Sequence, residues 1–314
     1  MIQILQNQII NDFIKKNFDS IVLLKKDLKI NVDLNTILIQ IKLHLPLYQE
    51  IQLANESISI IKHILEINMP YFREYEKFHN IIFKKYEKLL YNSKLKGKNK
   101  LYLVLENGNK LDILFKKISN KNIDYIFQNN LHYIKRYRKD TYESYGIFLN
   151  NDEYPICYAS LSISDRTYLS NALIKLNIIQ DTDEYKALTM TRAFGFNGIP
   201  KNMMSKLFDK IYKTYKNNDL NFILTALNPM VGFQGSIFKG SSYFIFATSP
   251  MEYKYDKNGL YLNRRSSINK QIIKQNIQTP PIVWFGRGLK KYYQEKLENN
   301  KNIYNISKEE YNNE

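Results

Sequence analysis

Residues 188–211 read LTMTRAFGFNGIPKNMMSKLFDKI, and this unit is the most informative part of the sequence. An apolar strand pattern runs into a turn that contains Gly195 and Gly198, and a helix pattern follows with Pro200 near its first turn. The start of a helix offers unpaired N–H groups and the positive end of the helix dipole. With Lys201 and Asn202 in the first turn, the unit is a candidate binding site for a pyrophosphate group.

A second strand pattern, NFILTAL at residues 221–227, leads into the glycine-rich segment NPMVGFQGSIFKGSSYF at residues 228–244. Its three glycines let the backbone approach a ligand closely. If the two strands are neighbours and diverge where these segments begin, their ends open a cleft over the sheet. Asn228, Phe238 and Tyr243 are the polar and aromatic groups that we expect near this cleft.

The surrounding patterns predict an α+β domain with a mostly antiparallel sheet flanked by helices. Hairpin signals occur at residues 100–118, around ENGN, and at residues 145–163, around NNDEYP. A helix and loop pattern lies between the hairpins, and further strand patterns follow residue 243. The chain contains no internal repeat and no Walker A, GxGxxG, HExxH or GxSxG motif.

The first 95 residues have the apolar spacing of helices, as in IQILQNQIINDFIKKNF and ESISIIKHILEINM. SKLKGKNK at residues 93–100 is interpreted as a linker. We therefore expect three parts: a helical N-terminal region (1–95), a core domain (101–295) and a peripheral C-terminal tail (296–314).

The composition excludes several classes of protein. The 314 residues are 44% apolar, which is enough for a sizeable core. No apolar run is long enough to span a membrane, and charges interrupt the apolar runs of the first thirty residues, so we expect a cytoplasmic protein without a membrane partner. The single cysteine, Cys157, excludes an internal disulfide and is expected to be a core thiol. The histidine spacing predicts no metal site.

The net charge of +16 and the pI near 9.5 suit a polyanionic partner, and we expect DNA. One basic cluster, HYIKRYRK at residues 132–139, interleaves aromatic and basic side chains, which suits stacking on bases together with phosphate contacts. A second cluster has nine basic residues and one acid between residues 254 and 291. A solvated surface is the alternative interpretation of each cluster. The DNA-contact candidates are Lys135, Arg136, Arg138, Lys239, Arg264 and Arg265.

The series TRAFGFNGIPKN and LNPMVGFQGSIFKGSSYF, with the His132–Tyr133 pair and the YGIFL strand upstream, resembles the phage-encoded Mom DNA-modification family. That family belongs to the GNAT acyltransferase superfamily. Its members run in the same order through a His-Tyr pair, a strand ending in Thr-Arg, a Pro-Arg/Lys-Asn helix start and a Pro-x-x-Gly-x-x-Gly-x-x-Tyr-Lys-Ala segment. The resemblance covers roughly residues 101–265 and implies a GNAT-like catalytic domain with an N-terminal helical extension.

The resemblance also implies a chemistry: adenine in DNA becomes an N6-acyl or methylcarbamoyl derivative at the expense of acetyl-CoA, protecting phage or mobile-element DNA from restriction. Iron is a suspected requirement, with His132 as the candidate ligand. The implied catalytic residues are His132, Tyr133, Asn228 and Tyr243. The candidates for acetyl-CoA binding are Thr191, Arg192, Phe194, Gly195, Gly198, Lys201, Asn202, Met203 and Phe238.

Two positions depart from the family pattern. Phe238 stands where the family often has tyrosine, and Asn228 stands where it has an acidic residue. Neither side chain can act as a general acid or base, so Tyr243 or His132 must take that role or the chemistry differs. Two alternatives therefore stay open: an N-acyltransferase acting on a protein, tRNA or small-molecule amine, and a GNAT-like DNA-binding module without catalysis.

Overall fold

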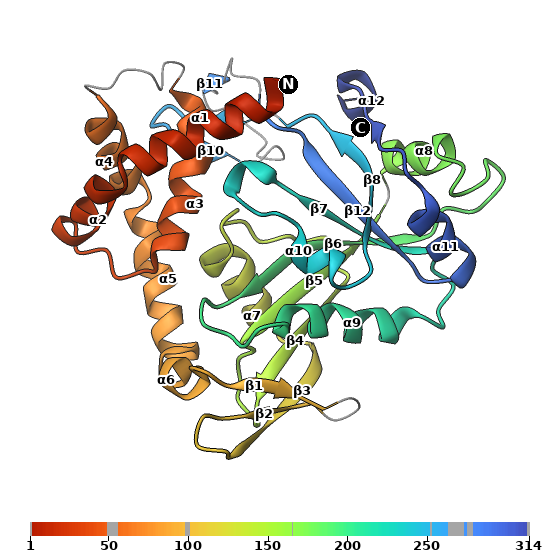
Figure 1. Ribbon diagram of the computed structural model, residues 1–314, viewed down its shortest axis with the longest axis horizontal. Helices are drawn as coiled ribbons and strands as arrows, with labels where there is room; N and C mark the ends of the chain where they lie inside the picture. The colour runs from red at the N-terminus through yellow and green to blue at the C-terminus, as the bar shows by residue number, and fades with distance from the viewer. Residues whose placement is uncertain are drawn as a thin grey trace.

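The computed structural model describes residues 2–48, 56–97, 101–164, 166–251, 253–262, 273–274 and 279–312. These residues form an α+β fold around a ten-stranded sheet in the order β1-β2-β3-β4-β5-β6-β7-β12-β8-β13 (Figure 1). Neighbouring strands are antiparallel except β6 with β7 and β8 with β13, which are parallel. The predicted fold class, a mostly antiparallel sheet flanked by helices with an N-terminal helical region, is confirmed.

Both predicted hairpins and both predicted central strands are present. The strands of the large sheet are β1 (Lys94–Lys96), β2 (Tyr102–Val104), β3 (Lys110–Ile118), β4 (Glu143–Leu149), β5 (Cys157–Ile163), β6 (Ala187–Gly195), β7 (Phe222–Leu227), β8 (Phe244–Ser249), β12 (Ile282–Gly288) and β13 (Tyr304–Asn305). A small second sheet contains β9 (Lys254–Tyr255), β10 (Tyr261–Leu262) and β11 (Ile273–Lys274).

The N-terminal region is helical, as expected. Its helices are α1 (Ile2–Lys16), α2 (Phe18–Asp27), α3 (Leu34–His44), α4 (Ser57–Ile67), α5 (Met69–Ile82) and α6 (Glu87–Leu90). The remaining helices are α7 (Lys121–Tyr125), the π-helix η3 (Ile126–Leu131), α8 (Thr167–Lys175), α9 (Met203–Tyr215), α10 (Ser236–Lys239), α11 (Lys291–Asn299) and α12 (Lys308–Asn312). Short 3₁₀ turns are η1 (Leu45–Leu47), η2 (Lys84–Tyr86) and η4 (Pro229–Val231).

Three local features differ from the sequence expectation. The segment expected to be a linker contributes β1, which pairs with β2 at the edge of the large sheet. Helix α9 begins at Met203 rather than near Pro200, because Asn202 has a left-handed backbone (φ 69°) that cannot continue a helix. In the segment expected to be a tail, β13 pairs with β8 and Ile306 is buried, so this segment extends the sheet and its core.

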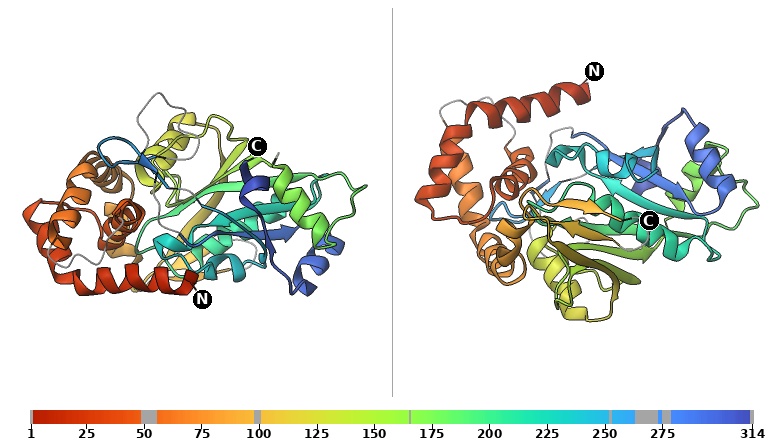
Figure 2. Two further views of the ribbon diagram at one scale, coloured as in Figure 1. Left: turned by 90° about the horizontal axis from the view of Figure 1, so that it is seen from above. Right: turned by 60° about the horizontal axis from the view of Figure 1, so that its bottom comes forward.

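Figures 1 and 2 show how the helices surround the sheet. Helices α1–α6 stand beside the sheet on one side in every view, and α8, α11 and α12 lie at the opposite side. Helix α9 lies across the strands and buries Leu207, Phe208 and Ile211 along one stripe, with contacts to β4 and β5. This 3.6-residue periodicity is what predicted the helix from sequence.

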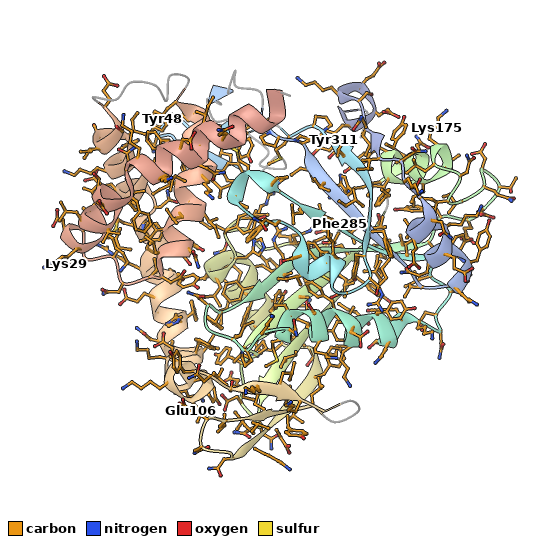
Figure 3. The ribbon with its side chains drawn as sticks, viewed as in Figure 1. Lys29, Tyr48, Glu106, Lys175, Phe285 and Tyr311 are labelled. Carbon is orange, nitrogen blue, oxygen red and sulfur yellow. The ribbon has the colours of Figure 1, made fainter. Side chains whose placement is uncertain are left out.

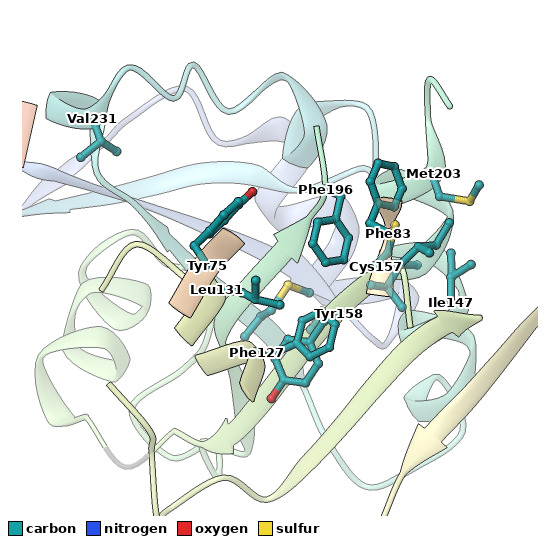
Figure 4. Packing of buried hydrophobic residues seen from close by; sticks show 14 of the residues in the cluster. Tyr75, Phe83, Phe127, Leu131, Ile147, Cys157, Tyr158, Phe196, Met203 and Val231 are labelled. Atoms are coloured by element: carbon teal, nitrogen blue, oxygen red, sulfur yellow. The ribbon is translucent and has the colours of Figure 1, made fainter. Parts of the chain in front are cut away.

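The N-terminal helices share their core with the strands. The Phe83 ring, after α5, stacks on Phe196, which follows β6, with ring centroids 4.8 Å apart (Figure 4). Phe127 of η3 in turn stacks on Tyr158 of β5 at 4.9 Å. Rings from the N-terminal region, the π-helix and two strand segments thus form one buried cluster. Burial of such rings contributes about 1.5–3 kcal/mol for each side chain.

Gly235, in the glycine-rich segment after β7, has a backbone that requires glycine. Its φ is +72°, and a Cβ atom there would lie 2.7 Å from Cζ of Phe285, which Figure 3 labels on β12. Gly108 has a similar φ of +83°, but a Cβ atom there would meet nothing within 4 Å. Substitution by alanine at Gly108 therefore carries only the cost of the left-handed backbone, whereas at Gly235 the steric cost of the contact with Phe285 is added.

We predict that Gly235→Ala lowers the free energy of unfolding by about 2–4 kcal/mol, since left-handed strain and overpacking add. Gly108→Ala, the matched control, should lower it by about 1–2 kcal/mol, the conformational cost alone. Urea unfolding of both variants measures the difference. Equal losses would show that Phe285 moves aside without cost.

Candidate active-site cleft

The two central parallel strands separate after four paired residues. β6 pairs with β7 from Ala187 opposite Phe222 to Met190 opposite Thr225, and the pairing then ends. β6 nevertheless continues to Gly195 beside β5, while β7 continues beside β12. The register between β5 and β6 shifts so that no residue of β5 stands opposite Thr191 in the strand pairing, which marks a β-bulge. Because a bulge bends its strand, β6 turns away from β7 at Thr191.

A cavity of about 1450 Å³ opens where the strands separate. One wall is the end of β6 with residues 196–199, and a second is the end of β7 with residues 232–238. A third wall is the segment 131–140, which follows η3, and residues of α3 and α5 complete the cavity. Ligand pockets usually have about 300–1000 Å³, so this cleft has room for a cofactor together with a second substrate.

The predicted cofactor residues divide into two sets. Thr191, Arg192, Phe194, Gly195 and Phe238 line the cleft. Gly198, Lys201, Asn202 and Met203 do not: Lys201 and Asn202 are exposed at the start of α9, and Met203 is fully buried in the core.

The segment between β6 and α9 brings its backbone close to the cleft. A Cβ atom on Gly195 would lie 2.7 Å from Cδ1 of Ile199 and 3.0 Å from Sδ of Met204. The turn therefore folds tightly over the start of α9, where the N–H of Met203 donates to the carbonyl of Pro200 at 3.2 Å and the Asn202 side chain makes no cap hydrogen bond.

Three of the four predicted catalytic residues, His132, Tyr133 and Asn228, line the cleft. Tyr243 does not: it is 1% exposed and packs beside Phe238, with its hydroxyl buried and without a hydrogen-bond partner among the described residues. Burial raises the pKa of the Tyr243 hydroxyl, so this group stays protonated at neutral pH.

Asn228 has a structural role that its sequence pattern did not indicate. Its Oδ1 accepts the N–H of Met230 at 3.0 Å, which caps the 3₁₀ turn η4 at the end of β7. Its Nδ2 donates to the Tyr253 hydroxyl at 2.8 Å. Asn228 thus fixes the direction in which the chain leaves β7.

His132 follows the π-helix η3 directly and is buried. Its Nδ1 accepts the N–H of Ile134 at 3.2 Å, which places the proton of the neutral ring on Nε2. Burial, and then the nearby charge of Arg192, hold the His132 pKa well below its usual range. The ring is therefore neutral at pH 7, and it stacks on Tyr133 with centroids 4.4 Å apart. Burial raises the pKa of Tyr133 to about 12.

The residues around His132 do not suit iron. The charge that acts on its pKa is the cation Arg192, and no group of three His, Cys, Asp or Glu side chains in the described part of the chain could hold a metal ion. Iron is usually bound by histidine together with carboxylate or thiolate ligands.

The predicted DNA-contact residues are dispersed. Arg136 and Arg138 line the cleft, and Nε of Arg138 donates to Oδ1 of Asp140 at 3.0 Å. Lys239 is exposed on α10, outside the cleft. Arg264 and Arg265 lie outside the described residues.

Lys135 is held by the N-terminal helices, which sequence reasoning did not connect with the site. Its Nζ donates to Oε1 of Gln40 at 2.9 Å and to Oδ1 of Asn68 at 2.7 Å. The Tyr71 hydroxyl donates to the carbonyl of Leu131 at 3.0 Å. Residues of α3 and α5 therefore fix the segment that carries His132 and Tyr133. Because these contacts join residues more than 55 positions apart, no local pattern could have indicated them.

The similarities to known proteins concern the fold. The sequence matches no known family profile, and no curated protein matches it significantly. Among solved structures, an N-acetyltransferase from Staphylococcus aureus Mu50 is 12% identical with a TM-score of 0.32, covering 56% of this chain and 97% of its own. A Bacillus acetyltransferase in complex with CoA is 12% identical with a TM-score of 0.34, covering 57% and 98%. NAA60 of Arabidopsis thaliana in complex with acetyl-CoA is 12% identical with a TM-score of 0.37, covering 56% and 98%.

These identities and scores say nothing about chemistry, so the assignment of an activity depends on the cleft itself. In addition, none of the described helices combines the length and the apolar character that a membrane span needs.

Lys135 generates a prediction about pH. Burial lowers its pKa to about 7, against an ordinary value near 10.4 in the unfolded chain. Between these two values the unfolded state binds a proton that the folded state does not, so stability rises with pH in this window. We expect Lys135→Met to lack this contribution. The free energy of unfolding of the variant should therefore rise with pH less steeply than that of the wild type, by about 1 kcal/mol per pH unit.

Urea unfolding of the wild type and of Lys135→Met at pH 7.5, 8.5 and 9.5 measures the two slopes. Titration of Cys157 and of the other groups is common to both proteins and cancels in the comparison. Parallel profiles would show that Lys135 keeps an ordinary pKa in the folded protein.

Proposed function

We propose that the protein is an acyl-CoA-dependent N-acyltransferase of the GNAT superfamily. The observation that carries this proposal is the divergence of β6 from β7 at Thr191, which leaves the β7-facing edge of β6, as far as Gly195, without a strand partner among the described residues. A free strand edge beside a cleft can hydrogen-bond an extended, amide-containing chain. The pantetheine arm of acyl-CoA is such a chain, and acetyl-CoA is the donor that the sequence resemblance implies.

The cofactor fits this cleft in one direction. We propose that its phosphates lie at the turn of residues 195–199, which lines the cleft and leads to the positive end of the α9 dipole, where negative charge is favoured. Its thioester is then placed near Thr191, where the strands begin to separate. His132 and Tyr133, on the third wall, face the space left for the acceptor.

For the acceptor, we propose the N6 amine of adenine in DNA. Three features support this choice: the resemblance to the Mom family, the net charge of +16, and the cleft wall in which Arg136 and Arg138 accompany aromatic rings. The Tyr133 ring on this wall lies 5.7 Å from the Phe233 ring on the second wall, and both rings offer stacking surfaces for a base. Because a base inside a duplex cannot enter such a cleft, the enzyme acts on a flipped or unpaired adenine.

The chemistry requires little from the protein beyond position. The neutral amine nitrogen attacks the thioester carbonyl carbon, a C–N bond forms and the C–S bond breaks. The proton lost from nitrogen goes to the departing thiolate, so that CoA leaves as a thiol. Tyr133 keeps its proton at pH 7 because its pKa is about 12, and it is a hydrogen-bond donor for the developing negative charge.

Acetyl-CoA binding tests the cofactor assignment. Ala226 is an exposed residue of β7 that lines the cleft, so an indole at this position fills the space between the strands. We expect Ala226→Trp to weaken acetyl-CoA binding at least tenfold in calorimetry. The matched control Asn171→Trp, exposed on α8 outside the cleft, should bind like the wild type. Acetyl-CoA binding that is unaffected by Ala226→Trp would move the cofactor out of this cleft.

Nucleoside mass spectrometry tests the acceptor assignment. DNA from cells that express the wild-type chain should contain deoxyadenosine carrying an added N6 group, and DNA from cells expressing Ala226→Trp should contain only the unmodified nucleoside. Unmodified adenine in the presence of folded, acetyl-CoA-binding protein would contradict the DNA assignment. Measuring the release of CoA from acetyl-CoA in the presence of other amines would then identify the acceptor.

A further inference from the structure

Arg192 is a buried cation with no acidic partner among the described residues. It follows the bulge residue Thr191 on β6, lines the cleft and is 5% exposed. Its two hydrogen bonds go to main-chain carbonyls, from Nη1 to Thr191 at 2.7 Å and from Nη2 to Arg136 at 3.4 Å. Its Nε is buried without a hydrogen-bond partner in the described part of the chain.

The charged groups around Arg192 do not neutralise its positive charge. After burial, the largest effect on the Arg192 pKa comes from the charge of another cation, Arg138, which lowers it. Both acidic residues that line the described cleft are engaged elsewhere: Asp33 accepts from the Thr36 hydroxyl at 2.7 Å, and Asp140 pairs with Arg138. A buried guanidinium without a counter-charge is unfavourable for folding, and its position in a cleft makes it a candidate for binding an anionic ligand.

The chemistry around Arg192 indicates the kind of ligand. A guanidinium presents a planar fork of donors that matches a phosphate or carboxylate. The electrostatic neighbours of Arg192 include Tyr133 and Tyr261, which also line the cleft. A cationic fork beside aromatic rings suits a molecule that has both an aromatic base and a phosphate.

We propose that Arg192 binds the phosphate of the acceptor nucleotide and thereby selects phosphorylated acceptors over free nucleosides. The location of the acceptor beside the wall formed by residues 131–140 rests on the proposed function. The phosphates of CoA are the other source of the same chemistry. They are expected beyond Gly195, which is about 10 Å along β6 from Arg192 at 3.3 Å per residue. Arg192 therefore lies at the thioester end of the proposed cofactor path, and its Nη2 reaches the carbonyl of Arg136 on the cleft wall that faces the acceptor.

The experiment compares two probes on the full-length protein, 2′-deoxyadenosine and its 5′-monophosphate, by calorimetry. We expect the wild type to bind the monophosphate about tenfold or more tightly, as a hydrogen-bonded charge pair provides. Arg192→Met should reduce this preference to about one, and Arg192→Lys, which keeps the charge but not the fork, should retain part of it. The matched control is Arg287→Met: Arg287 is similarly buried, lies outside the cleft and pairs with Asp209, so its loss should leave the preference intact.

Equal affinity of the wild type for both probes, or binding of neither, would overturn the proposal without any variant. A second arm measures CoA and dephospho-CoA with the same proteins. If Arg192→Met weakens CoA selectively and leaves the nucleotide preference unchanged, the phosphate belongs to the cofactor and the proposal fails. If the wild type does not bind CoA at all, the proposed transferase activity is contradicted. The comparison of the two nucleotide probes would still show whether Arg192 binds a phosphate.

Discussion

The end of hydrogen bonding between β6 and β7 is the constraint on which the rest of the structure depends. Parallel strands normally stay paired, and these two separate because the bulge at Thr191 bends β6 while β12 holds β7 on its other side. The divergence creates the cleft, frees one edge of β6 and directs the chain into the turn before α9. It also places Arg192 and Asn228 on opposite walls of one cavity.

The N-terminal helices belong to this arrangement. Gln40, Asn68 and Tyr71 hydrogen-bond the segment that follows η3, and Phe83 stacks on Phe196 behind the turn at the end of β6. The helices thus support two of the three cleft walls and complete the cavity. A neutral His132 and a protonated Tyr133 follow from this enclosure, because both pKa values are shifted chiefly by burial.

The sequence predicted the elements better than their assembly. Alternating apolar residues located β6 and β7, and the stripe of Leu207 and Ile211 located α9, because these signals are local. The insertion of β12 between β7 and β8, the pairing of β13 and the anchoring of Lys135 depend on contacts between distant segments. Five predicted cofactor residues and three predicted catalytic residues meet in the cleft, while Tyr243 lies in the core behind Phe238. Tyr243 directly precedes β8, and a tyrosine beside the start of a strand is typical of both places, so periodicity alone could not distinguish them.

Hydrogen exchange of the main-chain amides tests the central claim, that the free edge of β6 holds an acyl-CoA donor. The amides of residues 191–195 that point away from β5 lie on an edge that lacks its β7 partner, so a bound pantetheine arm should protect them. The account predicts that saturating acetyl-CoA slows exchange in residues 191–195 and in the turn at 196–203, with little change in β12. Protection elsewhere with unchanged exchange in these residues would contradict it.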